Sequence, residues 1–130
     1  MTILIIDDDN FVRMLTRVSL SKVGGMTVVE AASGADGLAT AAQLKPDVIL
    51  LDVMMPGMDG PDTLKALRAE PATAAIPIIF LTAKAMPGEQ ARLSALGAAA
   101  VFTKPFDPLK LGDEVRRVVS ELGGQAGNIA

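Results

Sequence analysis

Short runs of consecutive hydrophobic residues recur along the chain, and polar residues follow each run directly. Uninterrupted apolar runs of about four to eight residues are typical of strands that are buried on both faces of a parallel sheet. A less regular segment at residues 26–31 predicts one more strand. The four continuous runs span residues 3–6, 48–51, 77–81 and 100–103.

The segments between these strands have the features of helices. Ser33 suits an N-cap position and Pro46 would end the helix that follows it. Gly97 suits the residue after a helix, and Asp107-Pro108 suits the start of the last one. We expect helices at residues 10–23, 34–44, 61–69, 85–96 and 108–122. Their inward faces are predicted to include Phe11, Val12, Leu15, Val18 and Leu20 in the first helix, and Leu38, Ala41, Ala42 and Leu44 in the second.

Strict alternation of strands and helices predicts an α/β fold. Right-handed crossovers then give a doubly wound (βα)5 structure, a three-layer sandwich around a five-stranded parallel sheet. For this sheet we expect the flavodoxin-like strand order 2-1-3-4-5, which is one of the common doubly wound orders. The 130 residues suit a single domain over residues 1–122, and we expect residues 123–130 to be a flexible tail.

Composition excludes several classes of function. The net charge of −3 argues against direct binding of nucleic acid, because no basic stripe is available to pair with phosphates. No apolar run reaches the roughly 18 residues needed to cross a bilayer, so we expect no membrane insertion. The absence of cysteine fits a cytoplasmic protein. The absence of histidine means that this chain carries no phosphohistidine of its own.

The polar residues at the strand ends predict one site. In an open parallel sheet the carboxyl ends of the strands form one edge, where ligands bind. Acidic side chains with no histidine or cysteine nearby favour Mg²⁺, which prefers hard oxygen ligands. A carboxylate flanked by Mg²⁺ and an ammonium group can act as a nucleophile toward a phosphoryl group. The residues brought to this edge are Asp7, Asp8, Asp9, Asp52, Thr82 and Lys104.

Four motifs in this order resemble the receiver domain of two-component response regulators, of the chemotaxis-regulator type. They are Ile5-Ile6-Asp7-Asp8-Asp9, the segment from Leu51-Asp52 to Asp59-Gly60, Leu81-Thr82-Ala83 and Thr103-Lys104-Pro105-Phe106. The resemblance covers residues 2–122. It implies a phosphoprotein that catalyses its own phosphorylation and dephosphorylation as a switch in signal transduction or a phosphorelay, and not a conventional turnover enzyme.

The resemblance also implies a role for each residue. Asp52 is the phospho-acceptor, while Thr82 and Lys104 bind the phosphoryl group. The Mg²⁺ ligands are Asp7, Asp8, Asp52 and the backbone carbonyl of Met54, and the Lys104-Pro105 peptide bond is cis. Asp9 and Asp59 are predicted to cap helices.

The chain departs from the family pattern in two respects, which involve three positions. Val101 stands where receiver domains usually carry an aromatic residue that turns inward on activation. Phe102 is predicted to point to the opposite face, because adjacent strand residues alternate. Met54 and Lys84 stand at positions that tune phosphate lifetime in the family, and the apolar Met54 side chain predicts slow to moderate dephosphorylation.

The family resemblance implies two kinds of partner. The phosphodonor is a sensor histidine kinase or a histidine phosphotransferase that docks on the first helix. A downstream protein binds through residues 85–122. We expect a stand-alone regulator, and an N-terminal receiver excised from a multidomain regulator remains an alternative.

Two other hypotheses about function use the same residues. The segment from Ile3 to Asp9 also resembles the first motif of haloacid-dehalogenase-type phosphatases, in which Asp7 would be the nucleophile and Asp9 the acid/base. The phosphatase hypothesis assigns no role to Asp52. A receiver that only docks is disfavoured by the complete set of acids, threonine and lysine.

Overall fold

Strands and helices alternate along the chain as the hydrophobic pattern predicts. The computed structural model describes residues 1–83 and 86–129, with side chains described as far as Leu122. The elements are β1 (Thr2–Ile6), α1 (Asn10–Val18), the π-helix η1 (Ser19–Val23), β2 (Thr27–Ala31), α2 (Gly34–Leu44), β3 (Val48–Asp52), α3 (Gly60–Ala69), β4 (Ile78–Thr82), α4 (Pro87–Ala95), β5 (Ala100–Thr103) and α5 (Leu111–Ile129).

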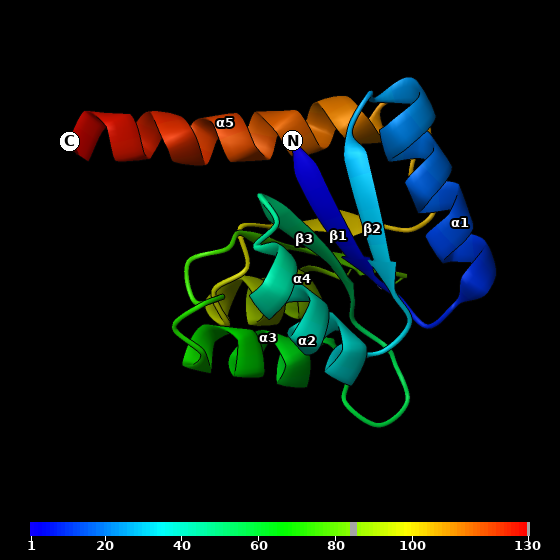
Figure 1. Ribbon diagram of the computed structural model, residues 1–130, viewed down its shortest axis with the longest axis horizontal. Helices are drawn as coiled ribbons and strands as arrows, with labels where there is room; N and C mark the ends of the chain where they lie inside the picture. The colour runs from blue at the N-terminus through cyan, green and yellow to red at the C-terminus, as the bar shows by residue number, and fades with distance from the viewer. Residues whose placement is uncertain (84–85, 130) are drawn as a thin grey trace.

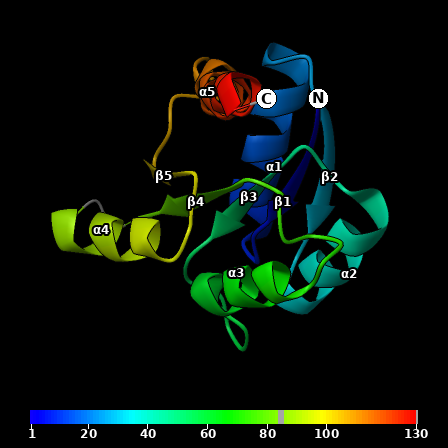
Figure 2. The same cartoon turned by 90° about the vertical axis from the view of Figure 1, so that its left-hand side faces the viewer.

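All five strands form one parallel sheet in the order β2-β1-β3-β4-β5, which confirms the predicted topology. Helices α1 and α5 lie on one side of the sheet, and α2 and α3 lie on the other (Figures 1 and 2). The predicted three-layer sandwich is therefore present. None of the helices in the described part of the chain is both long enough and apolar enough to cross a bilayer.

The central strands are buried on both faces, and alternate residues enter two separate cores. On one face, Leu4, Ile49 and Phe80 pack with α2, α3 and α4. On the other face, Ile5 and Leu50 pack with η1 and α5. This double burial explains why the strands are continuous hydrophobic runs, and it fixes which residue stands at each strand end.

The first helix differs from the prediction in its geometry and its exposed face. It is an α-helix only to Val18 and continues as η1, where the Gly24 N–H donates to the Ser19 carbonyl at 3.0 Å. Ser19 Oγ also donates to the carbonyl of Pro108 at 2.5 Å, so a contact with the segment before α5 accompanies the wider turn. Phe11 was predicted to face inward and is instead 66% exposed.

The ends of α4 and α5 differ from the predicted boundaries, and α2 differs in one residue of its predicted inward face. Helix α4 is described from Pro87, and the predicted start at residue 85 lies outside the described residues. Helix α5 begins at Leu111 because a turn held by Asp107 comes first, with the Leu109 N–H donating to Asp107 Oδ1 at 2.9 Å. It ends at Ile129 and not near residue 122, since glycine lowers helix propensity without forbidding helical backbone. Helix α2 has the predicted bounds and the predicted Ser33 cap, but its Leu44 is exposed, contrary to the prediction.

Gly60 allows α3 to begin against the end of β3. A Cβ atom at this residue would lie 2.5 Å from the Asp52 carbonyl oxygen and 2.8 Å from the Val53 Cα. Both are backbone atoms, so relief requires a shift of the chain that carries Asp52. Gly88, near the start of α4, has no heavy atom within 4 Å of the same position.

Gly60→Ala is expected to destabilise the protein by about 1–3 kcal/mol, the usual cost of overpacking. Gly88→Ala is the matched control and should leave stability unchanged or slightly raised, because alanine favours helix more than glycine. Urea unfolding followed by far-UV circular dichroism measures both, since the chain has no Trp or Tyr for fluorescence. Equal midpoints for the two variants would contradict the proposed close contact.

Candidate functional site: an acidic pocket at the carboxyl edge of the sheet

The carboxyl ends of β1, β3, β4 and β5 bring the predicted site residues to one edge of the sheet. Asp52 is the last residue of β3 and pairs in register with Leu81 of β4. Thr82 ends β4, is buried, and pairs with Thr103 of β5. Lys104 follows β5 directly. Because the strands are parallel and in register, residues distant in sequence become neighbours here.

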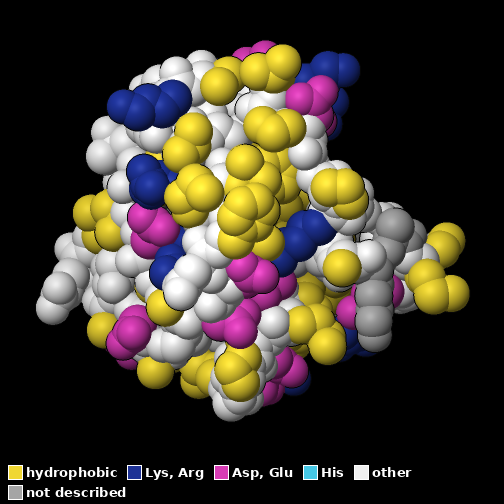
Figure 3. Space-filling view, turned by 90° about the vertical axis from the view of Figure 1, so that its right-hand side faces the viewer, with side chains coloured by type: hydrophobic (Ala, Val, Ile, Leu, Met, Phe, Trp, Pro, Cys, Tyr) yellow, Lys and Arg dark blue, Asp and Glu magenta, His cyan; other side chains and the backbone are white. Residues whose placement is uncertain are grey.

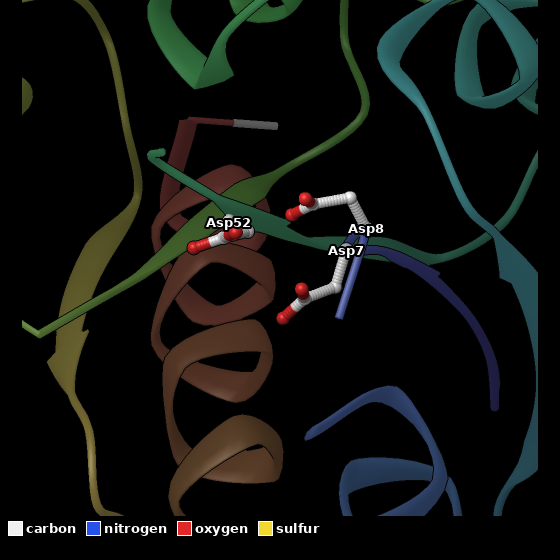
Figure 4. Close-up of side chains that lie close together, drawn as sticks. All are labelled: Asp7, Asp8 and Asp52. Carbon is white, nitrogen blue, oxygen red and sulfur yellow. The ribbon is translucent and has the colours of Figure 1, made fainter. Parts of the chain in front are cut away.

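Three carboxylates form the centre of the pocket. One oxygen from each of Asp7, Asp8 and Asp52 lies within 4.8 Å of the others. Figure 4 shows the three side chains directed into the same space from the ends of β1 and β3. Asp7 and Asp52 are only 1% and 7% exposed, whereas Asp8 is exposed. Two buried carboxylates at such a distance repel one another, so a positive charge must balance them.

Lys104 supplies that charge by spanning the two buried acids. Its Nζ lies 3.2 Å from Asp7 Oδ2 and 3.0 Å from Asp52 Oδ1. Its backbone N–H donates to the Thr82 carbonyl at 2.8 Å, which fixes where the side chain starts. The Lys104-Pro105 peptide bond is cis, as the family resemblance implied. The ammonium group therefore joins the ends of three strands.

Burial and charge act against each other in this ion pair. Burial raises the pKa of Asp52, the nearby charges of Asp7 and Asp8 raise it further, and the hydrogen bond from Lys104 only partly offsets them. For Lys104 burial acts to lower the pKa, but the hydrogen bond and charge of Asp52, together with Asp7, outweigh it and raise the pKa. Lys104 is thus held in its charged form, beside a carboxylate that is costly to ionise.

The turn after β1 is organised by the acids themselves. Asp9 Oδ1 accepts hydrogen bonds from the N–H groups of Phe11 and Val12 at 2.9 and 3.1 Å, so Asp9 is the predicted cap of α1. Asp7 Oδ1 accepts the Asp9 N–H at 2.9 Å. Asp59 similarly caps α3 by accepting the Asp62 N–H at 2.9 Å. Asp9 and Asp59 therefore have local structural roles, as predicted.

The donor set of the pocket suits a hard divalent cation. All the side-chain ligands on offer are carboxylate oxygens, and the chain contains no histidine or cysteine. The carboxylate of Asp8 has no hydrogen bond or ion pair within the described residues, so its oxygens are available. Met54 lies two residues beyond Asp52, with its side chain exposed to solvent. The pocket is therefore an acidic cluster able to hold a cation.

The strand that precedes Lys104 carries the departure from the family pattern. Val101 packs against the core on the side of α2, α3 and α4, whereas Phe102 packs against the core on the side of α5. The prediction that these two side chains point to opposite faces is confirmed. Lys84, the second position associated with phosphate lifetime, lies outside the described residues.

Sequence reasoning missed one residue that contacts this site. Arg13, on α1, donates from Nη1 to the Asp7 carbonyl oxygen at 2.8 Å. The only signal in the sequence is a basic residue about one helical turn after three consecutive acids, a spacing that also fits an ordinary surface arginine.

Comparisons with known proteins agree with this geometry. Protein PilH of Pseudomonas aeruginosa is 33% identical over 117 residues, which cover 90% of this chain and 97% of PilH. The phosphate regulon regulator PhoB of the same organism is 36% identical over 122 residues, or 94% of this chain and 53% of PhoB. The chain also spans about half the length (48%) of the transcriptional regulator RpaA of Synechocystis, at 38% identity over 90% of this chain.

A solved structure and a family model complete the comparison. The chemotaxis protein CheY4 of Vibrio cholerae superposes with a TM-score of 0.83 at 34% identity, covering 90% of this chain and 97% of that one. The family model of the response regulator receiver domain matches residues 3–116. This chain therefore belongs to the response regulator receiver domain family.

Proposed function

We propose that this receiver domain takes a phosphoryl group onto Asp52 from the phosphohistidine of a partner protein. The observation that carries the proposal is the position of Asp52, a buried carboxylate held 3.0 Å from Lys104 Nζ and beside two further acids. A carboxylate nucleophile, the ammonium group of Lys104 and a pocket able to bind a metal cation thus lie together at the carboxyl edge of the sheet. The chain has no histidine, so the donor is another protein or domain.

Transfer forms one bond and breaks one. A carboxylate oxygen of Asp52 bonds to phosphorus, the phosphorus–nitrogen bond of the donor breaks, and the imidazole leaves with the electron pair and takes up a proton. Lys104 then exchanges its contact with a carboxylate for one with a phosphoryl oxygen. Thr82, buried at the end of the neighbouring strand, is assigned to donate a hydrogen bond to the same group.

Mg²⁺ is the proposed cofactor. Asp7, Asp8, Asp52 and the backbone carbonyl of Met54 would hold it, and when bound it supplies positive charge beside the phosphoryl oxygens. The support from this chain is the set of carboxylate oxygens within 4.8 Å of one another, one of them on an exposed residue. Asp7 is already fixed by Lys104 and by the Asp9 N–H, so Asp8 is the most accessible ligand.

A groove beside the pocket supports docking of the donor on α1. It has a volume of about 360 Å³ and is lined by Phe11, Val12, Leu15, Ala83, Lys104, Pro105 and Phe106. Figure 3 shows hydrophobic side chains gathered on this face directly beside acidic ones. The exposure of Phe11, which the core leaves uncovered, fits contact with an apolar surface of a sensor histidine kinase or phosphotransferase.

Residues 85–122 are proposed to bind the downstream protein, and residues 1–122 to form the receiver unit. Because Val101 is aliphatic, we propose that switching moves residues 82–88, of which 84 and 85 lie outside the described residues, and that it does not depend on rotation of an aromatic side chain. Family membership supports a cytoplasmic location.

The phosphatase hypothesis is disfavoured by the environment of the two acids that it requires. Asp9 Oδ1 already accepts the hydrogen bonds that cap α1, and Asp7 is almost fully buried.

Acetyl phosphate and Mg²⁺ together should add a single phosphoryl group to the wild-type protein, measured as intact mass. Asp52→Asn should show no adduct, and omission of Mg²⁺ should abolish it in the wild type. Asp9→Asn, which keeps an oxygen able to cap α1, serves as the matched control and should still be phosphorylated. Steady release of phosphate that is lost in Asp7→Asn but kept in Asp52→Asn would contradict the proposal and favour the phosphatase.

Asp52→Asn should also stabilise the protein at neutral pH without divalent cations. Because the folded-state pKa of Asp52 is raised, the folded state holds the charged carboxylate less well than the unfolded chain does. The amide removes that charge at similar shape, so the variant is expected to unfold at a higher urea concentration than wild type. As pH falls through the raised pKa, folded wild type takes up a proton at Asp52 and the advantage of the variant disappears. Urea unfolding at several pH values measures this. A variant less stable than wild type, or a difference that does not change with pH, would refute it.

A further inference from the structure

Arg13 reaches back from α1 to the peptide group that joins the two acids of the pocket. Its Nη1 donates to the Asp7 carbonyl oxygen at 2.8 Å. That oxygen belongs to the same planar peptide unit as the N and Cα atoms of Asp8. A hydrogen bond that orients the Asp7 carbonyl therefore also orients the backbone from which the Asp8 side chain starts.

Arg13 is itself held in place by two other side chains. Its Nε donates to Glu30 Oε1 at 3.2 Å, and its Nη2 donates to Asn10 Oδ1 at 2.6 Å. The Arg13 side chain is only 16% exposed. Because a guanidinium group is planar, three acceptors in three directions leave it little freedom to rotate.

Strand β2 thus fixes the backbone of Asp7 at two points, one in each of the two peptide groups that flank its Cα atom. The Asp7 N–H donates to the carbonyl of Ala31, at the end of β2, at 3.1 Å. The Asp7 carbonyl is tied to Glu30, the preceding residue of β2, through Arg13. The turn that carries the pocket is therefore anchored to a strand outside the pocket.

Asp8 depends on this anchoring more than the other two acids do. Asp7 and Asp52 are both held by Lys104, whereas the Asp8 carboxylate has no hydrogen bond or ion pair in the part of the chain that the structure describes. Its oxygen still lies within 4.8 Å of oxygens of Asp7 and Asp52. The direction of the Asp8 side chain toward these oxygens therefore depends on the backbone from which it starts.

We propose that Arg13 is a positioning residue for cation binding, which sets the direction of Asp8 through the Asp7 carbonyl and is itself anchored by Glu30. The inference rests on the proposed function, in which this pocket binds Mg²⁺. Arg13 is also a positive charge near the acids. If it acted only as a charge, its removal would strengthen Mg²⁺ binding, so the sign of the effect separates the two roles.

Mg²⁺ affinity measured by isothermal titration calorimetry tests the proposal without phosphorylation. Arg13→Gln is expected to weaken Mg²⁺ binding about tenfold, the lower end for loss of an outer partner of a metal ligand. Arg13→Lys should give an intermediate loss, because one ammonium group cannot bond the carbonyl, Glu30 and Asn10 in the same geometry. Binding by Arg13→Gln that equals or exceeds that of wild type would overturn the proposal.

Arg17→Gln is the matched control. Arg17 lies on the same helix and pairs with the same Glu30, with 3.0 Å between Nε and Oε2, but among the described residues it makes no hydrogen bond to Asp7. Its replacement removes the same charge and should leave Mg²⁺ affinity unchanged or slightly higher. A tenfold loss in Arg17→Gln as well would overturn the specific role of the Arg13 contact.

Amide hydrogen exchange at Asp9, followed by NMR without metal, gives a second readout, since this N–H donates to Asp7 Oδ1. Faster exchange in Arg13→Gln but not in Arg17→Gln supports the proposal, and equal exchange overturns it. Wild type that fails to bind Mg²⁺ would refute the proposed function, and the exchange rates would still decide the role of Arg13. If Arg13→Gln does not fold, Glu30→Ala replaces it, because this variant removes the oxygen that accepts the Arg13 Nε hydrogen bond, and the same directions are expected.

Discussion

The rest of the site depends on holding two buried carboxylates, Asp7 and Asp52, against their mutual repulsion at one edge of the sheet. Two like charges about 4 Å apart cost roughly 4 kcal/mol even at an effective dielectric near 20. Lys104 relieves part of that cost by contacting both carboxylates, at 3.2 and 3.0 Å. The raised pKa of Asp52 shows that relief is incomplete, because burial and the neighbouring acids outweigh the ammonium group. The pocket therefore favours further positive charge, which is the property expected of a cation site beside a phospho-acceptor.

The sheet makes this crowding possible. Side chains of β1, β3 and β4 enter cores on both faces, so a strand cannot slip by one residue without exchanging its two buried faces. The register fixes Asp52 opposite Leu81 and Thr82 opposite Thr103. The stability of the two cores thus offsets the cost of the charged edge. A buried apolar scaffold and a highly charged edge are two consequences of the same strand arrangement.

Much of this arrangement could be predicted from the sequence, because the two strongest signals are local. Apolar runs identify the strands, and the residue after each run identifies the edge, so the meeting of Asp7, Asp52 and Lys104 follows from topology. The features that were missed depend on tertiary contacts. The π-helix at Ser19 accompanies a hydrogen bond to Pro108, which is distant in sequence. The exposure of Phe11 depends on how α1 meets the sheet, and periodicity alone does not define that. Arg13 acts on a backbone carbonyl, and no side-chain pattern encodes such a contact.

A crystal structure of the protein with Mg²⁺ and beryllium fluoride would show directly whether Asp52 is the phospho-acceptor, because beryllium fluoride forms a tetrahedral adduct on a reactive carboxylate in the manner of a phosphoryl group. We expect the adduct on Asp52, with Lys104 and Thr82 contacting its fluorine atoms and the metal held by Asp7 and Asp8. An adduct on Asp7, or a metal bound away from these acids, would contradict this expectation.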